Sequence, residues 1–520
     1  MGDELTSTTV RIGKFLGINQ RIDQIEIDPK ECVDETNYNI TDEALERRKG
    51  STKLNSTAFK EKTSTTPVPI TGMYQTLLNG SSETVGIGGD AIRENSSTWN
   101  DITGSVTITS DATSKWTFST FLDGAVAEVI IASNGVNPPI KWTGIGNANA
   151  LATPPGNFKF QVVHKNKLWV SIGDIVYFSA LRNGESWDLA NDLVRFQNNG
   201  EEITGLAVYN DRVIVFQETR IYAISGSSNR DLFVQTVVTG EGCISGYSLQ
   251  EVESRRYGNI LIFLAKDGVV KGFNGSKNLL QLGEPAIPLF KTKNLSAGNQ
   301  ATSGNYRTLG QYWLSLIEGS GTTSDVIVLY DYRNDVFNSQ TGRQLSSILR
   351  HDGINANSMA VFDSSGLELL VTGDYNGFAL RQDFGLLDED ANTISSIWQS
   401  GRLGFGSVEV VKLLADFHML TTQASGSDID VTLLTGGSTG TASISIAGGL
   451  WGTGLWGTMK WVKSTSIYSR LRMTPDNDRG LIGRFMQILI EHTTASQTLN
   501  INELVISVSS LGIQPEFVDV

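Results

Sequence analysis

Three glycines near the carboxyl end of the chain have the spacing of a nucleotide-binding loop. Gly452, Gly454 and Gly457 spell G-x-G-x-x-G after an alternating apolar stretch. In a dinucleotide-binding enzyme such a loop connects a strand to a helix, and the helix N-terminus binds the pyrophosphate. The residues that follow, TMKWVKSTSIYSR, are β-branched and Ser-rich and have no helical period. The glycines therefore predict a loop or hairpin, and we expect no cofactor there.

Carboxylates at two places could serve glycoside hydrolysis, which uses a pair of acids. Asp111 lies five residues before Trp116, a spacing that partly matches the Asp-box of sialidases, but Thr113 occupies the glycine position. The acidic run Asp388–Asp390 is interpreted as a solvated loop near a domain boundary. Neither place predicts a catalytic pair.

Histidine and calcium-loop patterns also lack the spacing that their chemistry needs. The four histidines are scattered along the chain: His164, His351, His418 and His492. None has a second histidine at the H-x-x-x-H spacing of a metal site, and none has the partner residues of a catalytic triad. The segment 475–480 resembles the start of a calcium loop, but Gln487 stands where the twelfth position needs Glu. We expect no catalytic, cofactor or metal site, and no enzymatic activity.

Composition favours an all-β protein with many turns. Charged residues make up 18% of the 520 residues, Gly is abundant at 54, and stretches typical of surface helices are nearly absent. The formal charge of −14 argues against wrapping of nucleic acid, which needs clustered Lys and Arg, although a polyanion could pass without sticking. No apolar run predicts a membrane span. Cys32 and Cys243 are expected to be buried thiols, and a disulfide between them stays open.

The middle of the chain repeats. Residues 162–179 align with residues 207–224 without a gap, at an offset of 45. Residues 257–273 align with the second copy at an offset of 48. Each copy has an alternating apolar strand, a tight polar turn and another apolar strand.

The repeat predicts a β-propeller. Leu168, Val213 and Leu261 are aligned, so they should occupy equivalent places in their sheets. Lys266–Gly268 should form a hairpin turn, with Gly supplying the positive φ. Units of 40 to 50 residues that each form a small antiparallel sheet are typical of propellers. We predict about seven blades over residues 61–390.

The two ends of the chain differ from the middle. Residues 1–60 are predicted to form an N-terminal arm with a short helix. Asp28 would cap that helix, with Pro29 at its first position and Glu31 three residues after the cap. After the repeat lapses, alternating stretches predict a C-terminal antiparallel β domain, like a sandwich, over residues 391–520.

Several segments, in chain order, resemble tail nozzle, or tail-hub, proteins of short-tailed bacteriophages. In that family an N-terminal segment with a Gly-x-Asn and a basic-Gly ending leads into a β-propeller, followed by β-rich domains. The corresponding places here are Gly17–Asn19 and Arg47–Gly50, the latter departing from the more usual Arg-Pro-Gly. The matching segments are GINQRIDQIEIDP, NITDEALERRKGSTKL, SNGVNPPIKWTG, VYFSALRNGESWD, ITGLAVYNDRVIVFQETRIYAISG and GRFMQILIEHTTASQTLNINELVISV.

The resemblance implies a structural component of a phage tail. It implies a homo-oligomeric ring, typically a hexamer, that extends the portal and adaptor channel, retains the packaged genome and lets DNA pass on ejection. Its partners would be portal or adaptor proteins and tail fibres or spikes, without sequence-specific DNA binding. Its place would be the virion, after assembly in the bacterial cytoplasm. The alternative is a glycan-binding or glycan-cleaving propeller for host recognition.

Three tryptophans in the glycine-rich loop, Trp451, Trp456 and Trp461, are candidate subunit contacts. A loop this rich in Gly is costly to order, and burial of large side chains could offset that cost. The buried surface would come from a neighbouring domain or chain, or from the core of their own domain. Both interpretations stay open.

Overall fold

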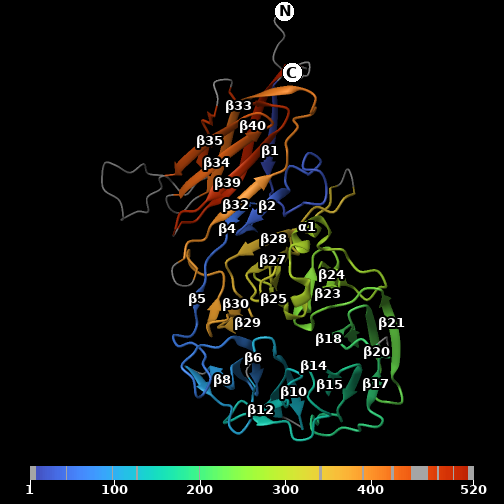
Figure 1. Ribbon diagram of the computed structural model, residues 1–520. Helices are drawn as coiled ribbons and strands as arrows, with labels where there is room; N and C mark the ends of the chain where they lie inside the picture. Colours follow the sequence, from blue (N-terminus) through green and yellow to red (C-terminus); the bar gives the residue numbers. More distant parts are fainter. Residues whose placement is uncertain are drawn as a thin grey trace, which may run out of the picture.

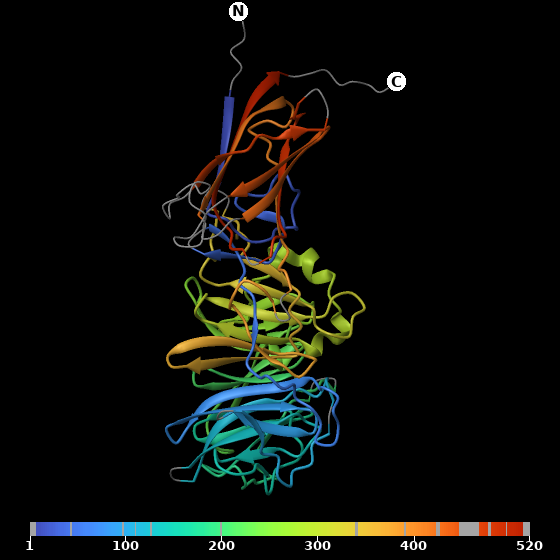
Figure 2. The same ribbon diagram turned by 90° about the vertical axis from the view of Figure 1, so that its left-hand side faces the viewer.

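Two all-β domains, a propeller and a sandwich, lie end to end along the long axis of the molecule (Figures 1 and 2). They are seen in a computed structural model. The glycine-rich loop and its three tryptophans, Trp451, Trp456 and Trp461, lie outside the described residues. The structure describes residues 7–41, 44–95, 98–109, 111–124, 127–197, 200–338, 342–388, 392–422, 427–446, 467–476, 480–495 and 497–512.

Seven antiparallel sheets, here called blades 1 to 7, make up the propeller. Blades 1 to 4 are β6 (Ile70–Leu78), β7 (Ser81–Gly88), β8 (Ala91–Asn95) and β9 (Trp99–Asp101); β10 (Thr117–Asp123), β11 (Ala127–Ser133), β12 (Ile140–Trp142) and β13 (Asn149–Ala150); β14 (Phe160–His164), β15 (Lys167–Ile172), β16 (Ile175–Phe178) and β17 (Leu193–Arg195); and β18 (Gly205–Tyr209), β19 (Arg212–Phe216), β20 (Arg220–Ser225) and β21 (Phe233–Thr239). Blades 5 to 7 are β22 (Gln250–Ser254), β23 (Gly258–Leu264) and β24 (Val270–Phe273); β25 (Thr302–Tyr306), β26 (Gln311–Leu316), β27 (Val326–Asp331) and β28 (Ile348–Asp352); and β29 (Ser358–Ser364), β30 (Leu367–Gly373), β31 (Ala379–Arg381) and β5 (Thr52–Lys53).

The blades form a closed ring. The first strands of neighbouring blades contact one another, and β29 of blade 7 contacts β6 of blade 1. Between blades 4 and 5 this contact is made by the short helix η1 (Gly246–Ser248). The other short helices lie between blades 5 and 6: η2 (Glu284–Ala286), α1 (Ile287–Lys291) and η3 (Leu295–Gln300). The predicted all-β fold with a seven-bladed propeller is therefore what the chain adopts.

The repeat alignment holds at the level of strand register. Leu168 pairs with Val163 and Val213 pairs with Val208, each one residue after the first pair of its hairpin. Leu261 also lies in a second strand. There the turn before the third strand is one residue longer, which shifts that strand by one position. Gly268 in this turn has a φ of +79°, as the hairpin prediction requires.

The second domain consists of two packed sheets. One has the order β3-β4-β40-β33-β36, with β1 on β40 and β38 on β33, and the other has the order β2-β32-β39-β34-β35-β37. Their strands are β1 (Ser7–Gly13), β2 (Cys32–Thr36), β3 (Tyr38–Thr41), β4 (Ala44–Arg47), β32 (Ser396–Ser400), β33 (Val411–Thr422), β34 (Ser427–Thr435), β35 (Thr439–Ile446), β36 (Ile467–Arg470), β37 (Thr474–Pro475), β38 (Ile482–Gly483), β39 (Met486–His492) and β40 (Asn500–Gly512).

The N-terminal segment is not a separate arm. Strands β1 to β4 belong to the two sheets of the sandwich, and β5 completes blade 7 of the propeller. The chain therefore starts in the sandwich, crosses once to the propeller, and returns to the sandwich after blade 7 (Figure 1).

The short helix predicted after Asp28 is a turn. The Asp28 carboxylate accepts a hydrogen bond from the Lys30 N–H at 3.1 Å, and its carbonyl accepts one from the Glu31 N–H at 2.9 Å. Glu31 cannot fold back onto Asp28 as a helix cap would require, because its carboxylate is bonded elsewhere, as described below. A four-residue turn from Asp28 to Glu31 satisfies the same backbone groups without a helix.

The cores of the two domains are continuous. One cluster of buried side chains runs from Phe15 and Trp398 between the sandwich sheets to Tyr312 and Leu329 in blade 6. The rings of Phe15 and Trp398 meet edge to face, with centroids 5.4 Å apart. Strand β2 contacts β28, the outer strand of blade 6. The sandwich is thus packed onto that blade. No helix in the described ranges is long and apolar enough to cross a membrane.

Candidate functional site

The Gly-x-Asn segment lies where the two domains meet. The Gly17 N–H donates to the Ser346 carbonyl and the Ile18 N–H donates to the Ile348 carbonyl, each at 2.8 Å. A Cβ atom at position 17 would lie 2.3 Å from the Ile348 carbonyl oxygen. Only glycine therefore permits this close approach to the last strand of blade 6.

The asparagine of the same segment holds a buried carboxylate. The Asn19 amide nitrogen lies 3.0 Å from both carboxylate oxygens of Glu31. The same carboxylate accepts hydrogen bonds from the Ser346 N–H and from Arg343, each at 2.7 Å. Burial raises the pKa of the Glu31 carboxyl, and the Ser346 N–H and Asn19 amide work against that rise. Glu31 therefore joins the N-terminal turn to blade 6.

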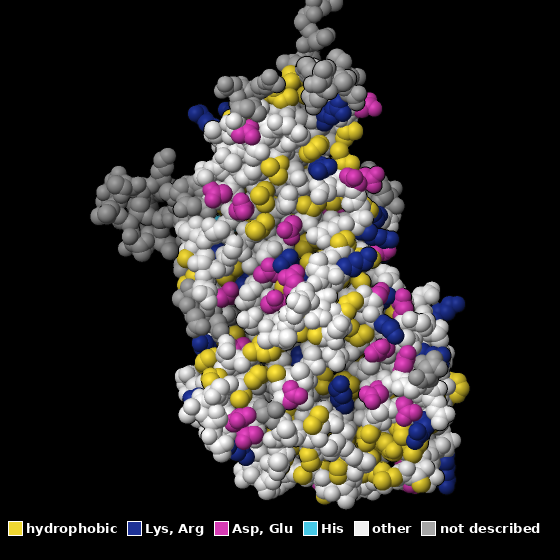
Figure 3. Space-filling view, in the orientation of Figure 1, with side chains coloured by type: hydrophobic (Ala, Val, Ile, Leu, Met, Phe, Trp, Pro, Cys, Tyr) yellow, Lys and Arg dark blue, Asp and Glu magenta, His cyan; other side chains and the backbone are white. Residues whose placement is uncertain are grey.

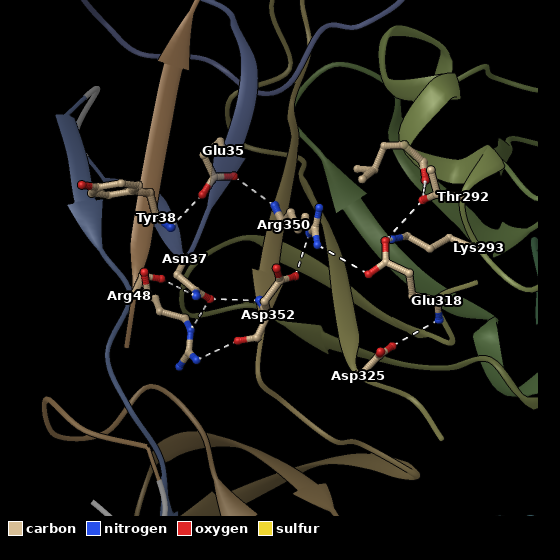
Figure 4. Close-up of polar contacts among 12 residues, drawn as sticks. Glu35, Asn37, Tyr38, Arg48, Thr292, Lys293, Glu318, Asp325, Arg350 and Asp352 are labelled. Carbon is tan, nitrogen blue, oxygen red and sulfur yellow. Dashed lines mark hydrogen bonds and ion pairs between the residues drawn. The ribbon is translucent and has the colours of Figure 1, made fainter. Parts of the chain in front are cut away.

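A second buried carboxylate, Glu35, makes a similar link (Figure 4). One of its oxygens accepts the Tyr38 N–H at 2.7 Å and the other accepts the Arg350 N–H at 3.0 Å. Burial raises the pKa of Glu35 well above its ordinary value. Beside it, His351 Nε2 lies 3.1 Å from the Tyr38 carbonyl oxygen, and burial lowers the pKa of this imidazole. These groups position β28 against the hairpin β3–β4.

Arg48 clamps the two connections that join the domains. Its Nη1 and Nη2 each lie 2.7 Å from one oxygen of Asp388, which belongs to the return connection. Its Nε donates to the Asn37 side chain at 2.7 Å, and Nη2 also donates to the Asp352 carbonyl at 3.1 Å (Figure 4). The Arg48 side chain is only 2% exposed. A bidentate pair of this kind fixes both charge and geometry.

The glycine that ends the basic motif has a steric role. Gly50 and the return connection run side by side, with hydrogen bonds from Gly50 N–H to Gly385 at 3.2 Å and from Phe384 N–H to Gly50 at 2.9 Å. A Cβ atom at position 50 would lie 1.8 Å from the Leu387 carbonyl oxygen. The basic-Gly ending is therefore explained locally, by an ion pair and a close backbone approach.

A polar groove of 710 Å³ borders this junction, between the N-terminal turn and helix α1. Lys293 Nζ lies 2.8 Å from Glu318, which is also 3.6 Å from Arg350. Arg350 in turn lies 2.7 Å from Asp352 (Figure 4). Burial would raise the pKa of Glu318, but the hydrogen bond and charge of Lys293 outweigh it and lower that pKa. Each of these charges is paired, which suits a structural role. Basic and acidic side chains are likewise interspersed on the described face in Figure 3.

The propeller contains a second hollow at its centre. The first strands of the blades line a central cavity of 340 Å³, which receives residues from all seven blades. It is continuous with a wider mouth of 940 Å³ bordered by blades 1, 5, 6 and 7. The residues common to both are Met73, Tyr74, Gln250, Glu251, Ser303 and Met359.

Two hydrogen bonds cross the axis of the propeller, at the end of the central cavity opposite the mouth. The Lys115 ammonium, just before blade 2, donates to the Gln300 carbonyl, just before blade 6. The Tyr247 hydroxyl, just before blade 5, donates to the Lys115 carbonyl at 2.9 Å. Because these blades are not neighbours, the bonds span the ring. These bonds close one end of the central cavity, which is therefore a pocket and not a channel through the propeller.

The acids and histidines considered from the sequence are not brought together. Asp111 is exposed, and its carboxylate accepts the Thr113 N–H at 2.9 Å, which lowers its pKa. Asp388 is the partner of Arg48, while Glu389 and Asp390 lie outside the described residues. The four histidines have separate surroundings. His164 lies 3.0 Å from Asp211, His418 lies 3.6 Å from Asp416, and His351 and His492 are buried in different elements.

Cys32 and Cys243 are buried free thiols, as expected. Burial raises the pKa of the Cys243 thiol to about 12, so it is protonated at neutral pH. Over the described part of the chain, no three His, Cys, Asp or Glu side chains lie together in a way that could hold a metal ion.

Sequence reasoning missed the polar residues that matter most in the structure. Glu31, Glu35 and Arg48 hold the domains together, and Lys115 crosses the propeller channel. The sequence signal that could have pointed to these residues is a charged residue inside or beside an alternating strand, where burial is expected. That pattern does not say which distant segment supplies the hydrogen-bond partner of the charged group.

Comparisons with known proteins give only distant likenesses. No family model and no curated protein matches the chain. One similar solved structure is the extracellular domain of a hybrid two-component system from B. thetaiotaomicron, with 9% identity and a TM-score of 0.37. That match covers 77% of this chain and 45% of the other. Two structures of BBS1N in complex with ARL6DN match with 11% and 10% identity and TM-scores of 0.30 and 0.38. They cover 72% and 66% of this chain, and 96% and 99% of theirs. At these TM-scores the likenesses carry no information on function.

Proposed function

We propose that the chain is a structural subunit of the tail of a short-tailed bacteriophage, of the nozzle or hub type. Subunits would form a ring, most simply a hexamer, that extends the portal and adaptor channel. The ring would retain the packaged genome and let it pass on ejection. Its partners would be portal or adaptor proteins and tail fibres or spikes, and the protein would act in the virion without catalysis.

The observation that carries this proposal is the junction of the two domains. Two of the places that contribute to the resemblance, Gly17–Asn19 and Arg47–Gly50, lie there and have a physical role. Their bonds make a propeller and a sandwich into one elongated body with a continuous core. A subunit that must bear load without changing shape needs such a junction, since separate domains move relative to one another by default.

The charge of the chain fits a channel that DNA slides through. Each subunit carries −14 formal charges, so six copies would carry −84. Like charge lowers adhesion of a polyanion to the wall. The passage would lie between subunits, because hydrogen bonds from Lys115 and Tyr247 cross the channel inside each propeller.

Particle mass and shape test the proposal directly. The purified full chain, alone and with the adaptor protein of the same virion, is examined by native mass spectrometry and negative-stain microscopy. Rings with a central hole support the proposal, and a ring of another size corrects only the subunit number. A chain that stays monomeric with the adaptor present contradicts it. Binding or cleavage of a host polysaccharide would instead favour the glycan-directed alternative.

A further inference from the structure

The central cavity of the propeller has one cation at its inner end. The side chain of Lys115 lines the cavity, and the residue is 3% exposed. An ammonium has three N–H donors, and among the described residues the acceptor of Lys115 is the Gln300 carbonyl. No described carboxylate offsets the effect of burial, which lowers the pKa of this lysine to about 7. A buried cation without an anion is costly, so the site is electrostatically incomplete.

The other polar groups of the cavity have partners. The Gln161 amide donates to the Ile131 carbonyl at 2.6 Å, and the Gln250 amide donates to the Ser303 carbonyl at 3.2 Å. The remaining wall is mixed: the hydroxyls of Thr71, Ser303 and Ser358 donate to backbone carbonyls, and the Glu251 carboxylate accepts from Asn259. Its apolar and aromatic side chains include Met73, Phe118, Phe160, Leu206, Leu249 and Met359. A ligand would therefore meet one ammonium donor at the inner end and, around it, apolar side chains together with polar groups that already have partners.

We propose that this cavity binds a small organic carboxylate, with the carboxylate on the Lys115 ammonium. The volume of 340 Å³ lies at the lower end of the range for small-molecule sites. The wider mouth of 940 Å³ gives such a molecule access from the side away from the crossing hydrogen bonds. The single cation favours a carboxylate over a phosphate, which needs more donors. This inference is independent of the proposed tail function.

Benzoate and its neutral isostere benzamide test the proposal on the full chain. Binding is measured by isothermal titration calorimetry at about pH 6, below the pKa of Lys115. We expect benzoate to bind more tightly than benzamide. Lys115→Met should weaken benzoate binding about ten- to a hundredfold, the usual value of a charge-assisted hydrogen bond, and leave benzamide binding unchanged. Lys115→Arg should retain most of the benzoate binding.

Lys159→Met is the matched control, because Lys159 lies at the same end of the channel over the rings of Phe160 and Tyr247. It should leave benzoate binding unchanged. Equal affinity of the wild-type chain for benzoate and benzamide overturns the proposal, whether or not the Lys115 variants fold. Benzoate binding that survives in folded Lys115→Met overturns it as well.

Discussion

The propeller and the sandwich differ in which strands pair: the propeller pairs strands that are neighbours in the chain, and the sandwich pairs strands from its two ends. In blades 1 to 6 each strand pairs with the strand that precedes or follows it in the chain. In the sandwich, β1 and β4 from the start of the chain pair with β40 near its end, so that Ser7 faces Ser509. Local pairing is specified by a short stretch of sequence, whereas long-range pairing also has a large loop-closure cost. The propeller can therefore be predicted from short stretches of sequence. The sandwich depends on pairing between segments that lie far apart in the chain.

The strongest test of this contrast removes the distant partners. Deleting residues 1–47 takes away β1 to β4 and exposes the edges of β40, β32 and β28. Exposed strand edges promote aggregation, so we expect loss of soluble protein or of cooperative unfolding. Deleting only residues 1–6 leaves all these strands in place and should change solubility little. A soluble shortened chain with an unchanged urea transition would contradict the contrast.

Two buried tryptophans allow the domains to be compared side chain by side chain. Trp398 between the sandwich sheets and Trp169 in blade 3 are both fully buried. Each change to alanine should lower the free energy of unfolding by about 3–5 kcal/mol, measured by urea denaturation. Hydrogen exchange should differ: Trp398→Ala should speed exchange in β1 and β2, and Trp169→Ala should speed it in blade 3. Identical exchange patterns would mean that the two domains open as one unit.

The clamp between the connections should matter less than either core. Arg48→Met leaves Asp388, which is 13% exposed, without its partner. We expect a loss of about 2–3 kcal/mol in the free energy of unfolding. Lys49→Met is the control, because Lys49 is half exposed and lies 3.6 Å from Asp383. Its effect should stay below about 1 kcal/mol. Equal losses of the free energy of unfolding in the two variants would show that Arg48 does not hold the two connections together.

The last expected effect is a gradual change of stability with pH, at most about 1.4 kcal/mol for each pH unit, that belongs to the propeller. Lys115 has a pKa of about 7 in the folded chain and an ordinary value of 10.5. Its penalty on folding is complete below pH 7 and fades as pH rises, because the unfolded chain then binds more protons than the folded one. Lys115→Met should thus be more stable than wild type at pH 6. Between pH 7 and 10 this advantage should shrink by up to about 1.4 kcal/mol per pH unit, as followed by urea denaturation. A constant difference across this range would show that Lys115 keeps its charge.

The same contrast explains which features could be predicted from the sequence. Leu168 and Val213 occupy equivalent positions because their hairpins have the same length, and a gapless alignment reports that directly. The alternating stretch at the end of the chain was also recognised as strand. Its pairing with β1 was not, since alternation gives the face of a strand and not its neighbour. The prediction of a helix after Asp28 is wrong because Glu31, which should fold back onto the Asp28 cap, instead accepts a hydrogen bond from the Ser346 N–H beside blade 6.

The pairing of β1 with β40 has a consequence for biosynthesis. Ribosomes add about 5–20 residues per second, so the partner of Ser7 is made about 25–100 s after Ser7 itself. During that interval β1 to β4 have emerged without their sheets, while the hairpins of blades 1 to 6 can form as they appear. The newborn chain therefore carries β1 without its partner strand, and the β3–β4 hairpin without its sheet, until translation is nearly complete. We expect its production in cells to depend on chaperones that protect this segment.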